Sequence, residues 1–388
     1  MKRRKFFSVT GTFTGGALVL PEFLQILNAQ VGESNAEQCL VFIQLNGGND
    51  GLNTFIPYVD PLYYQLRPNI ALGKDKVIGH HNGMAFHPAL PGFAEIQQHG
   101  NLSIIQNVGY PEPDRSHFRS QEIWQTASSA SQYLSEGWLG RFLDLQCRDH
   151  NPVAGVNLDL TDNLALRGLQ PNSITVKDPR RFKTRNSDER RVQLSDNPQL
   201  DFVRKIANSI ETGSAEIQAA LARSTSREDY PQTGLGRKLE WISQLIKGGL
   251  GSQIFYTSLN GFDTHDNQLA LHQRFLTELN DAVFSFYQDL RNADLLKSTS
   301  IVIFSEFGRR VADNGKGTDH GAAAPMFVIG GETKGKIIGS NPNLSDLDRG
   351  DLKYQIDFRS VYGSLIKNKF NFDPIEIGIN NEPLPGLF

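Results

Sequence analysis

Acidic, histidine and hydroxyl side chains recur in five short segments of the chain. The segments are 48–51 (Gly-Asn-Asp-Gly), 114–118 (Asp-Arg-Ser-His-Phe), 261–266 (Gly-Phe-Asp-Thr-His-Asp), 306–309 (Glu-Phe-Gly-Arg) and 318–321 (Thr-Asp-His-Gly). Carboxylate oxygens and imidazole nitrogens are the groups that bind zinc, manganese and related divalent ions. The segments therefore predict a divalent-metal site, whose candidate ligands are Asp50, Asp263, His265, Glu306, Asp319 and His320.

Each segment also has a purely structural interpretation. Asn-Asp-Gly sequences form tight turns, which accounts for Asp50. Ser116 is a preferred residue type for capping a helix that begins at His117. Asp263 or Thr264 could cap a helix in the same way, and Glu306 could form a surface ion pair with Arg309 or Arg310. Taken singly, Asp50 and Ser116 fit these interpretations better, but the recurrence of acidic residues in the five segments favours a site.

The elements between these segments explain how they could meet. Continuous apolar runs predict strands buried on both faces, at 39–45, 102–108, 253–259, 300–305 and 325–329. Helical patterns lie between them, at 117–127, 136–146, 199–222, 235–248, 265–291 and 358–369. Alternating strands and helices predict an α/β fold with a mostly parallel central sheet. Ligands of such sheets bind beyond the carboxyl ends of the strands, which is where the segments fall.

Residues 178–235 differ in composition from the rest. They carry dense charge at 178–181 and 188–191, followed by a long polar helical pattern. We expect this part of the chain to be a helical insertion over the core.

Composition narrows the class of protein. Without residues 1–29, which contain Lys2, Arg3, Arg4, Lys5 and Glu22, the 39 basic and 42 acidic residues become 35 and 41, a net charge of minus 6. A mildly acidic protein lacks the basic surface that nucleic-acid binding needs. The two cysteines, Cys39 and Cys147, cannot make a disulfide scaffold. We expect one large domain over 36–388, with no stable membrane span and no nucleic-acid partner.

Residues 1–29 are predicted to be an export signal. Lys2, Arg3, Arg4 and Lys5 precede Phe6-Phe7 and a short apolar stretch diluted by Gly and Thr, and no acidic residue precedes Glu22. An arginine pair before a weakly apolar core is typical of twin-arginine export, with the translocase as a transient partner. The stretch is shorter than the roughly 20 apolar residues of a membrane helix, although an uncleaved signal could still hold the protein at the membrane. The expected location is periplasmic or extracellular.

Five motifs in the same order resemble one known family. Leu45-Asn-Gly-Gly-Asn-Asp-Gly-Leu-Asn-Thr54, Arg115-Ser-His-Phe118, Phe262-Asp-Thr-His265, Ser305-Glu-Phe-Gly-Arg309 and Thr318-Asp-His-Gly321 resemble the DUF1501 family. This is a set of twin-arginine-exported proteins related to the alkaline phosphatase and sulfatase superfamily. The resemblance implies an alkaline phosphatase-like three-layer sandwich with a helical insertion.

The resemblance also implies roles for residues. Asp50 matches the metal-binding Asp after the first strand, Ser116 the nucleophile, Asp263 and His265 an Asp and His that bind one metal, and His320 the last metal-binding His. Glu306-Phe307 stands where the superfamily has an Asp-His pair, so the chain would hold one or two ions. Zinc or manganese is expected first, then calcium or magnesium. Different ligands, such as Asn49, Asp319 or His272, remain an alternative.

Other side chains around Ser116 suit an anionic substrate. Arg115 would steady an oxyanion, while Arg119 and Asn49 would contact substrate, since guanidinium groups bind tetrahedral oxyanions through two oxygens. His117 is a candidate general acid or base, or a metal ligand.

These features predict a metal-dependent hydrolase or transferase acting on a phosphate or sulfate ester, of a small molecule or a glycan. The alternative is a non-catalytic exported binding or assembly protein that keeps the same fold.

Overall fold

The computed structural model describes residues 38–147, 150–183, 198–224 and 228–388. The predicted signal at 1–29 lies outside the described residues, so it stays a prediction. Across the part of the chain that the structure describes, no helix combines the length and apolar composition needed to cross a membrane.

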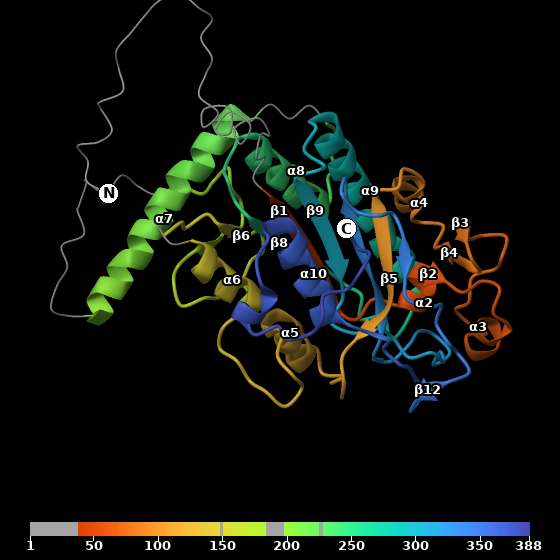
Figure 1. Ribbon diagram of the computed structural model, residues 1–388. Helices are drawn as coiled ribbons and strands as arrows, with labels where there is room; N and C mark the ends of the chain where they lie inside the picture. Colours follow the sequence, from red (N-terminus) through yellow and green to blue (C-terminus); the bar gives the residue numbers. More distant parts are fainter. Residues whose placement is uncertain (1–37, 148–149, 184–197, 225–227) are drawn as a thin grey trace, which may run out of the picture. The chain divides into compact units, whose positions relative to one another are not determined.

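A large twisted sheet forms the centre of the molecule (Figure 1). Its spatial order is β11-β5-β10-β9-β1-β8-β6-β7, and β14 also pairs with β5. All five predicted strands are confirmed within two residues at each end. The strands of this sheet are β1 (Cys39–Asn46), β5 (Leu102–Gly109), β6 (Gly155–Asn157), β7 (Ser173–Thr175), β8 (Ile254–Asn260), β9 (Thr299–Phe304), β10 (Ala324–Gly330), β11 (Ile337–Ile338) and β14 (Ile356–Asp357).

Strand direction decides which loops meet. β1 runs parallel to β8 and β9, whereas β10 runs antiparallel to both β9 and β5. Two reversals bring β5 back to the direction of β1. The carboxyl ends of β1, β5, β8 and β9 therefore lie on the same edge as the amino end of β10, and we call this edge the carboxyl edge.

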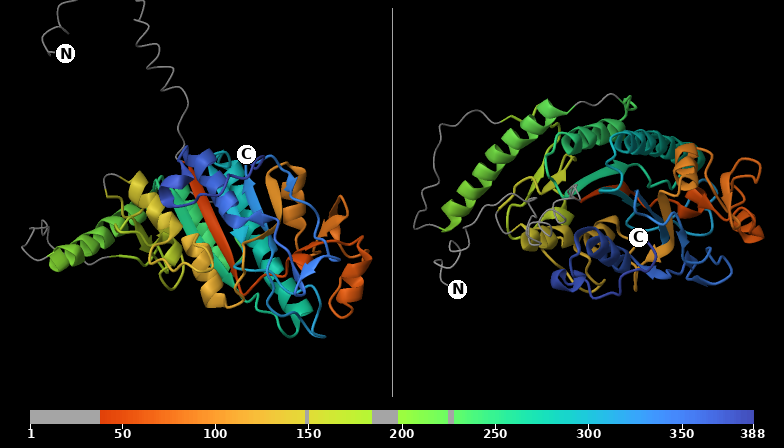
Figure 2. Two further views of the ribbon diagram at one scale, coloured as in Figure 1. Left: turned by 60° about the horizontal axis from the view of Figure 1, so that its bottom comes forward. Right: turned by 45° about the horizontal axis from the view of Figure 1, so that its top comes forward.

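Helices cover both faces of the sheet, which gives three layers (Figure 2). One layer holds α5, α6 and α10, and the other holds α4, α7, α8 and α9. The predicted α/β sandwich is thereby confirmed, with α4 as an additional helix. The bounds are α4 (Pro91–Gln98), α5 (His117–Thr126), α6 (Trp138–Gln146), α7 (Pro198–Arg223), α8 (Gly234–Lys247), α9 (Gln268–Asn292) and α10 (Phe358–Phe370).

Alternate residues of each central strand enter two different cores. In β1, Val41 and Ile43 pack toward α8 and α9, whereas Leu40 and Phe42 pack toward α5, α6 and α10. All four are at most 1 % exposed. This double burial is why the strand reads as a continuous apolar run.

Short elements surround the central layers. A three-stranded sheet of order β2-β4-β3 and a two-stranded pair, β12 with β13, lie outside the main sheet. These elements are α2 (Gly51–Thr54), β2 (Phe55–Ile56), α3 (Pro61–Leu66), β3 (Ile78–His81), β4 (Met84–Phe86), the 3-10 helix η2 (Leu164–Leu166), β12 (Leu347–Asp348), β13 (Asp351–Leu352) and the 3-10 helix η3 (Pro374–Ile377).

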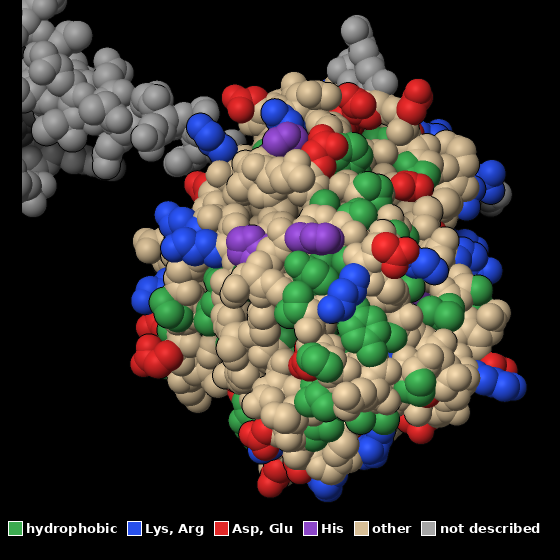
Figure 3. All heavy atoms as spheres, turned by 90° about the vertical axis from the view of Figure 1, so that its right-hand side faces the viewer, with side chains coloured by type: hydrophobic (Ala, Val, Ile, Leu, Met, Phe, Trp, Pro, Cys, Tyr) green, Lys and Arg blue, Asp and Glu red, His purple; other side chains and the backbone are tan. Residues whose placement is uncertain are grey.

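The side of the molecule seen in Figure 3 mixes acidic and basic side chains around a central group of hydrophobic ones. No continuous basic surface is present on the face drawn there.

The long helix α7 belongs to the expected insertion at 178–235. Its Ile217 and Ala220 are fully buried in the core that α8 and α9 share. α7 is thus part of a helical layer, and the boundaries of an insertion around it stay a prediction.

An aromatic stack fixes α5 against the sheet. The Trp124 ring stacks on Phe304 of β9 at 5.2 Å and on Phe358 of α10 at 4.3 Å between centroids. Since Trp124 is 2 % exposed, the stack holds α5 from both sides. His117, at the first turn of the same helix, is thereby kept at the carboxyl edge.

Replacing this anchor tests how strongly α5 depends on it. Trp124→Ala should lower the free energy of unfolding by about 3–5 kcal/mol, because a buried aromatic ring is lost and a cavity remains. Urea unfolding followed by circular dichroism measures the change. Leu160→Ala, at a side chain that is 73 % exposed, is the control and should change stability by less than about 0.5 kcal/mol. Equal effects of the two substitutions would contradict the proposed anchoring.

Candidate metal centre

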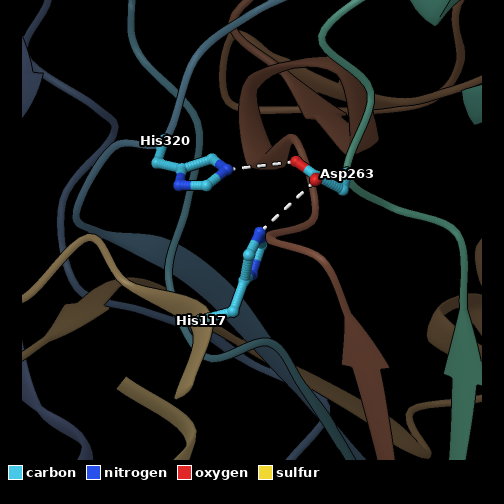
Figure 4. A group of neighbouring side chains, drawn as sticks. All are labelled: His117, Asp263 and His320. Atoms are coloured by element: carbon cyan, nitrogen blue, oxygen red, sulfur yellow. Dashed lines mark hydrogen bonds and ion pairs between the residues drawn. The ribbon is translucent and has the colours of Figure 1, made fainter. Parts of the chain in front are cut away.

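Three side chains from separate segments converge at the carboxyl edge. His117 begins α5, Asp263 follows β8 and His320 precedes β10. One potential ligand atom from each lies within 4.8 Å of the others. His320 Nε2 is 3.0 Å from Asp263 Oδ1, and His117 Nε2 is 3.5 Å from Asp263 Oδ2 (Figure 4).

His265 adds a third imidazole to the group. Its Nε2 lies 3.0 Å from Asp263 Oδ1 and 3.0 Å from His320 Nε2. The structure therefore brings together Asp263, His265 and His320, which the sequence indicated as candidate metal ligands. His117, for which the sequence left the roles of acid, base or ligand open, joins them through its Nε2 atom.

The other ring nitrogen of His117 faces a buried carboxylate. Nδ1 is 2.9 Å from Oε1 of Glu306, whose side chain is fully buried. The same oxygen accepts the Gly47 N–H at 2.9 Å and an N–H of Gln121 at 3.3 Å, so it acts as an acceptor here. His117 Nδ1 is therefore the donor. Glu306 therefore orients the His117 ring through this hydrogen bond. It does not contribute an oxygen to the converging atoms.

The remaining two rings are held in the same way. His265 Nδ1 lies 3.0 Å from Asp319 Oδ1, and His320 Nδ1 lies 2.8 Å from the Arg115 carbonyl oxygen. Carbonyl and ionised carboxylate oxygens only accept, so both Nδ1 atoms carry the proton. Asp319 thus accepts a hydrogen bond from His265 and is not itself among the converging side chains.

These tautomers leave a pattern that suits a cation. In the neutral rings each Nε2 presents a lone pair toward the Asp263 carboxylate, which is itself an acceptor. Imidazoles whose second nitrogen donates to a carboxylate or carbonyl are the usual arrangement of metal-binding histidines. The residues present therefore fit a divalent ion.

Charge supports the same conclusion. Asp263, Glu306 and Asp319 are three carboxylates at or beside the cluster, and Arg309 is the guanidinium that pairs with Asp263. With the carboxylates ionised, two negative charges remain, and one divalent cation would balance them.

The pKa shifts follow from these contacts. Partial burial acts to raise the pKa of Asp263, but the hydrogen bond and the positive charge of Arg309 outweigh it and lower that pKa to about 2. The hydrogen bond to Glu306 raises the pKa of His117 above its ordinary value, and the one from His265 lowers the pKa of Asp319. Asp263 and Asp319 are thus carboxylates at neutral pH.

Arg309 joins the loops that carry the cluster. Its side chain is fully buried and its ion pair with Asp263 Oδ1 measures 2.6 Å. The same guanidinium donates to four carbonyl oxygens, those of Gly47 at 2.6 Å, Gly48 at 2.8 Å, Phe262 at 2.9 Å and Thr318 at 2.8 Å. The surface pair between Glu306 and Arg309 that the sequence allowed does not occur among the described residues, because each is buried with another partner.

Phe307 closes one side of the cluster. Its ring centroid is 4.9 Å from that of His117 and 4.8 Å from that of His320. Gly48, at φ +78°, makes room for it, because a Cβ there would lie 2.3 Å from Phe307 Cε2. Phe307 therefore contributes an apolar wall to the cluster and no ligand atom.

Two predicted residues of the first motif lie apart from the cluster. Asp50 is 1 % exposed and its Oδ2 pairs with Arg67 Nη1 at 2.6 Å. Asn49, also 1 % exposed, hydrogen-bonds through Oδ1 to His272 Nε2 at 2.9 Å. Their side chains form an internal network, and the structure does not bring them to the converging Nε2 atoms.

Ser116 occupies the position just before α5. It is exposed, and its N–H donates to Asp114 Oδ1 at 2.7 Å. Within the described residues its hydroxyl makes no capping hydrogen bond to the helix, so capping does not account for this residue.

The two arginines beside Ser116 have other partners. Arg115 pairs with Asp351, and its side chain is 34 % exposed. Arg119 Nη2 donates to the carbonyl oxygens of Ala130 at 2.9 Å and Gln132 at 2.6 Å, and the guanidinium lies 3.8 Å from the Tyr133 ring centroid. Arg119 is thus directed at the loop after α5, which differs from the predicted contact with substrate.

Sequence reasoning missed Arg309, Arg67 and Phe307 as determinants of the site. Each is an arginine or aromatic residue in a turn-like segment, and no spacing rule distinguishes it from a surface residue. The one available signal was the position of Phe307 and Arg309 directly after a buried strand.

Arg309→Lys tests the role of this guanidinium. A lysine cannot reach all five acceptors, so the variant should lose about 2–4 kcal/mol of unfolding free energy. Urea unfolding in the presence of a chelator measures the loss without a contribution from bound metal. Arg310→Lys, at a side chain that is 33 % exposed, should cost less than about 1 kcal/mol. A loss at Arg309 no larger than at Arg310 would show that the guanidinium does not organise the edge.

Three comparisons relate this chain to known proteins. No curated protein matches the sequence. Similar solved structures are Ps i-CgsB in complex with k-i-k-neocarrahexaose (TM-score 0.41, 10 % identity, 89 % of this chain and 74 % of that one), and the C-terminal periplasmic domain of EcEptC from Escherichia coli in complex with Zn (0.38, 11 %, 77 % and 74 %). Another is the PsFucS1 sulfatase from Pseudoalteromonas sp. (0.38, 10 %, 91 % and 72 %).

At such identities and scores, the chemistry of the site has to be argued from this chain's own residues. A family model described as "Protein of unknown function (DUF1501)" matches residues 37–351. The match spans most of the chain, which therefore belongs to the DUF1501 family.

Proposed function

We propose that this protein is a metal-dependent hydrolase or transferase that acts on a phosphate or sulfate ester. The observation that carries the proposal is the convergence of three imidazole Nε2 atoms on the Asp263 carboxylate, at 3.0 Å for His265 and His320 and 3.5 Å for His117. Each ring has its Nδ1 on an acceptor. Such a cluster without a cation would place lone pairs against a carboxylate.

His117, His265, His320 and Asp263 would hold the ion. Three nitrogens and one carboxylate oxygen favour zinc, with manganese next, over calcium and magnesium, which prefer oxygen ligands. When bound, a divalent ion polarises the ester and lowers the pKa of a nearby hydroxyl.

Ser116 is the nucleophile in this proposal. It precedes the first turn of α5, which contains no acidic residue, and the free N–H groups of a helix start favour a tetrahedral anion. Ser116 Oγ would form a bond to phosphorus or sulfur while the bond to the leaving oxygen breaks. The hydroxyl proton would pass through water to that leaving oxygen. Water or an acceptor alcohol would then release the group, giving hydrolysis or transfer.

Export is part of the proposal. The twin-arginine pattern of residues 1–29 supports delivery to the periplasm or the cell exterior, by a route that carries folded proteins. Ligands from three distant segments converge only in the folded chain, so an ion bound before export would travel with it.

Metal content is the first test. Wild-type protein reconstituted with zinc should retain the ion on gel filtration, and chelator treatment should lower its Tm. Asp263→Ala or His320→Ala should weaken zinc binding by at least about 100-fold, because each removes a ligand to which the other groups are oriented. His81→Ala, at an exposed histidine of β3, is the matched control and should bind as the wild type does. Unchanged binding in the Asp263 and His320 variants would exclude a metal at this cluster.

Ester turnover is the second test. On a panel of phosphate and sulfate esters, Ser116→Ala should lower kcat by at least about 1000-fold while zinc content stays the same, since the nucleophile and not the site is lost. Ser131→Ala, at another exposed serine, should leave turnover unchanged. A metal-loaded protein with no Ser116-dependent turnover would favour the alternative, an exported binding or assembly protein.

A further inference from the structure

Arg67 is a second buried arginine at the carboxyl edge, in addition to Arg309. The Arg67 side chain is fully buried. Its guanidinium donates to four oxygens, Asp50 Oδ2 at 2.6 Å, Asn53 Oδ1 at 2.9 Å, the Val311 carbonyl at 2.8 Å and the Arg310 carbonyl at 2.8 Å. A carboxylate, an amide oxygen and two carbonyls are also the kind of oxygen set that a hard cation takes.

Asp50 is already neutralised by this guanidinium. Gln268 donates a further hydrogen bond to the same oxygen, Oδ2. Burial acts to raise the pKa of Asp50, but Arg67 outweighs it and keeps that pKa below its ordinary value. Burial also lowers the pKa of the neighbouring His272 to about 4, so this ring adds no charge.

A divalent ion bound to Asp50 would therefore lie close to the positive charge of Arg67. The Arg67 guanidinium nitrogen is 2.6 Å from the carboxylate oxygen, and both side chains are buried. Like charges at such distances repel strongly when water is excluded. Asp50 Oδ1 has no hydrogen-bond partner among the described residues, but the Arg67 guanidinium on Oδ2 already supplies the positive charge. The residues around Asp50 therefore do not favour a metal ion, whereas those around Asp263 do.

We infer that Arg67 is the resident cation of the Asp50 side of this edge, so the chain binds one divalent ion and Asp50 is a positioning residue. The inference rests on the proposed function, since it assumes that the cluster at Asp263 holds the ion. It predicts one ion, where the sequence left one or two open.

Asp50 reaches the ligands through Gln268. The side-chain Oε1 of Gln268 accepts the Thr318 hydroxyl at 2.6 Å, and its backbone N–H donates to Lys316 O at 3.1 Å. Gln268 lies three residues after His265 and Thr318 two residues before His320. The buried pair thus holds both ligand-bearing loops at a fixed separation, without contacting the ion.

The first experiment counts ions in the full-length folded protein. Native mass spectrometry and elemental analysis of the zinc-loaded wild type should give one ion per chain. Two ions would overturn this inference while leaving the proposed function intact. No ion would overturn the proposed function and, with it, the inference.

The second experiment neutralises the pair. Asp50→Asn combined with Arg67→Gln removes both charges, so no unpaired charge remains buried. This double variant should still bind one ion, with affinity reduced about 10-fold because the ligand loops lose their brace. Phe142→Ala, at a buried residue of α6, is the destabilising control and should leave zinc affinity unchanged. Loss of the ion in the double variant would show that Asp50 is a ligand, and an affinity loss shared with Phe142→Ala would show a general structural effect.

The third experiment removes the resident cation alone. Arg67→Ala leaves the Asp50 carboxylate facing three other oxygens, so millimolar calcium should raise the Tm of this variant by about 5 °C. Calcium should change neither the wild type nor the double variant Asp50→Asn, Arg67→Ala. If calcium raised the Tm of the wild type and Asp50→Asn abolished this increase, the assignment of Arg67 as the resident cation would be contradicted.

Discussion

The carboxyl edge depends on one buried guanidinium. Strands that end at this edge leave carbonyl groups without a ladder partner, and a buried carbonyl needs a donor. Arg309 supplies donors to carbonyls of the loops after β1 and β8 and of the loop before β10, and its remaining contact orients Asp263. A planar guanidinium has five N–H donors and can reach all of these acceptors, whereas an ammonium group has three donors and would leave some acceptors unpaired. The loops are therefore placed by the same residue that tunes a ligand.

The direction of β10 is the second constraint. Had β10 run parallel to β9, the residues before it would lie at the opposite edge of the sheet. Because it is antiparallel, His320 reaches the edge from the amino end of a strand, while Asp263 reaches it from a carboxyl end. α5 contributes His117 from its first turn, since the Trp124 stack fixes the helix against β9 and α10. Three different local geometries thus supply one cluster.

The charges at the edge form two groups, of which only the first is balanced. Asp50 is matched by Arg67, and this pair is fully buried. Asp263, whose side chain is 47 % exposed, shares Arg309 with neutral carbonyls and lies beside two further carboxylates. Only the second group is open to solvent and short of positive charge. Its accessibility is the physical reason why we propose an exchangeable ion there and not at Asp50.

The sequence by itself determined the layers and the edge. Apolar runs such as 39–45 must be buried on both faces, and helical periodicity between them requires an α/β sandwich, so the five motifs were bound to fall in turns beside strand ends. Residue type also made Asp263, His265 and His320 candidate metal ligands. Only the tertiary structure decided which atoms converge. Asp50 and Glu306 have the same chemistry as Asp263, yet one faces Arg67 and the other His117 Nδ1. The role of a carboxylate depends on the cation or hydrogen-bond donor nearest to it. For Glu306 that neighbour is His117, which lies more than 180 residues away in the sequence. For Asp50 it is the buried side chain of Arg67.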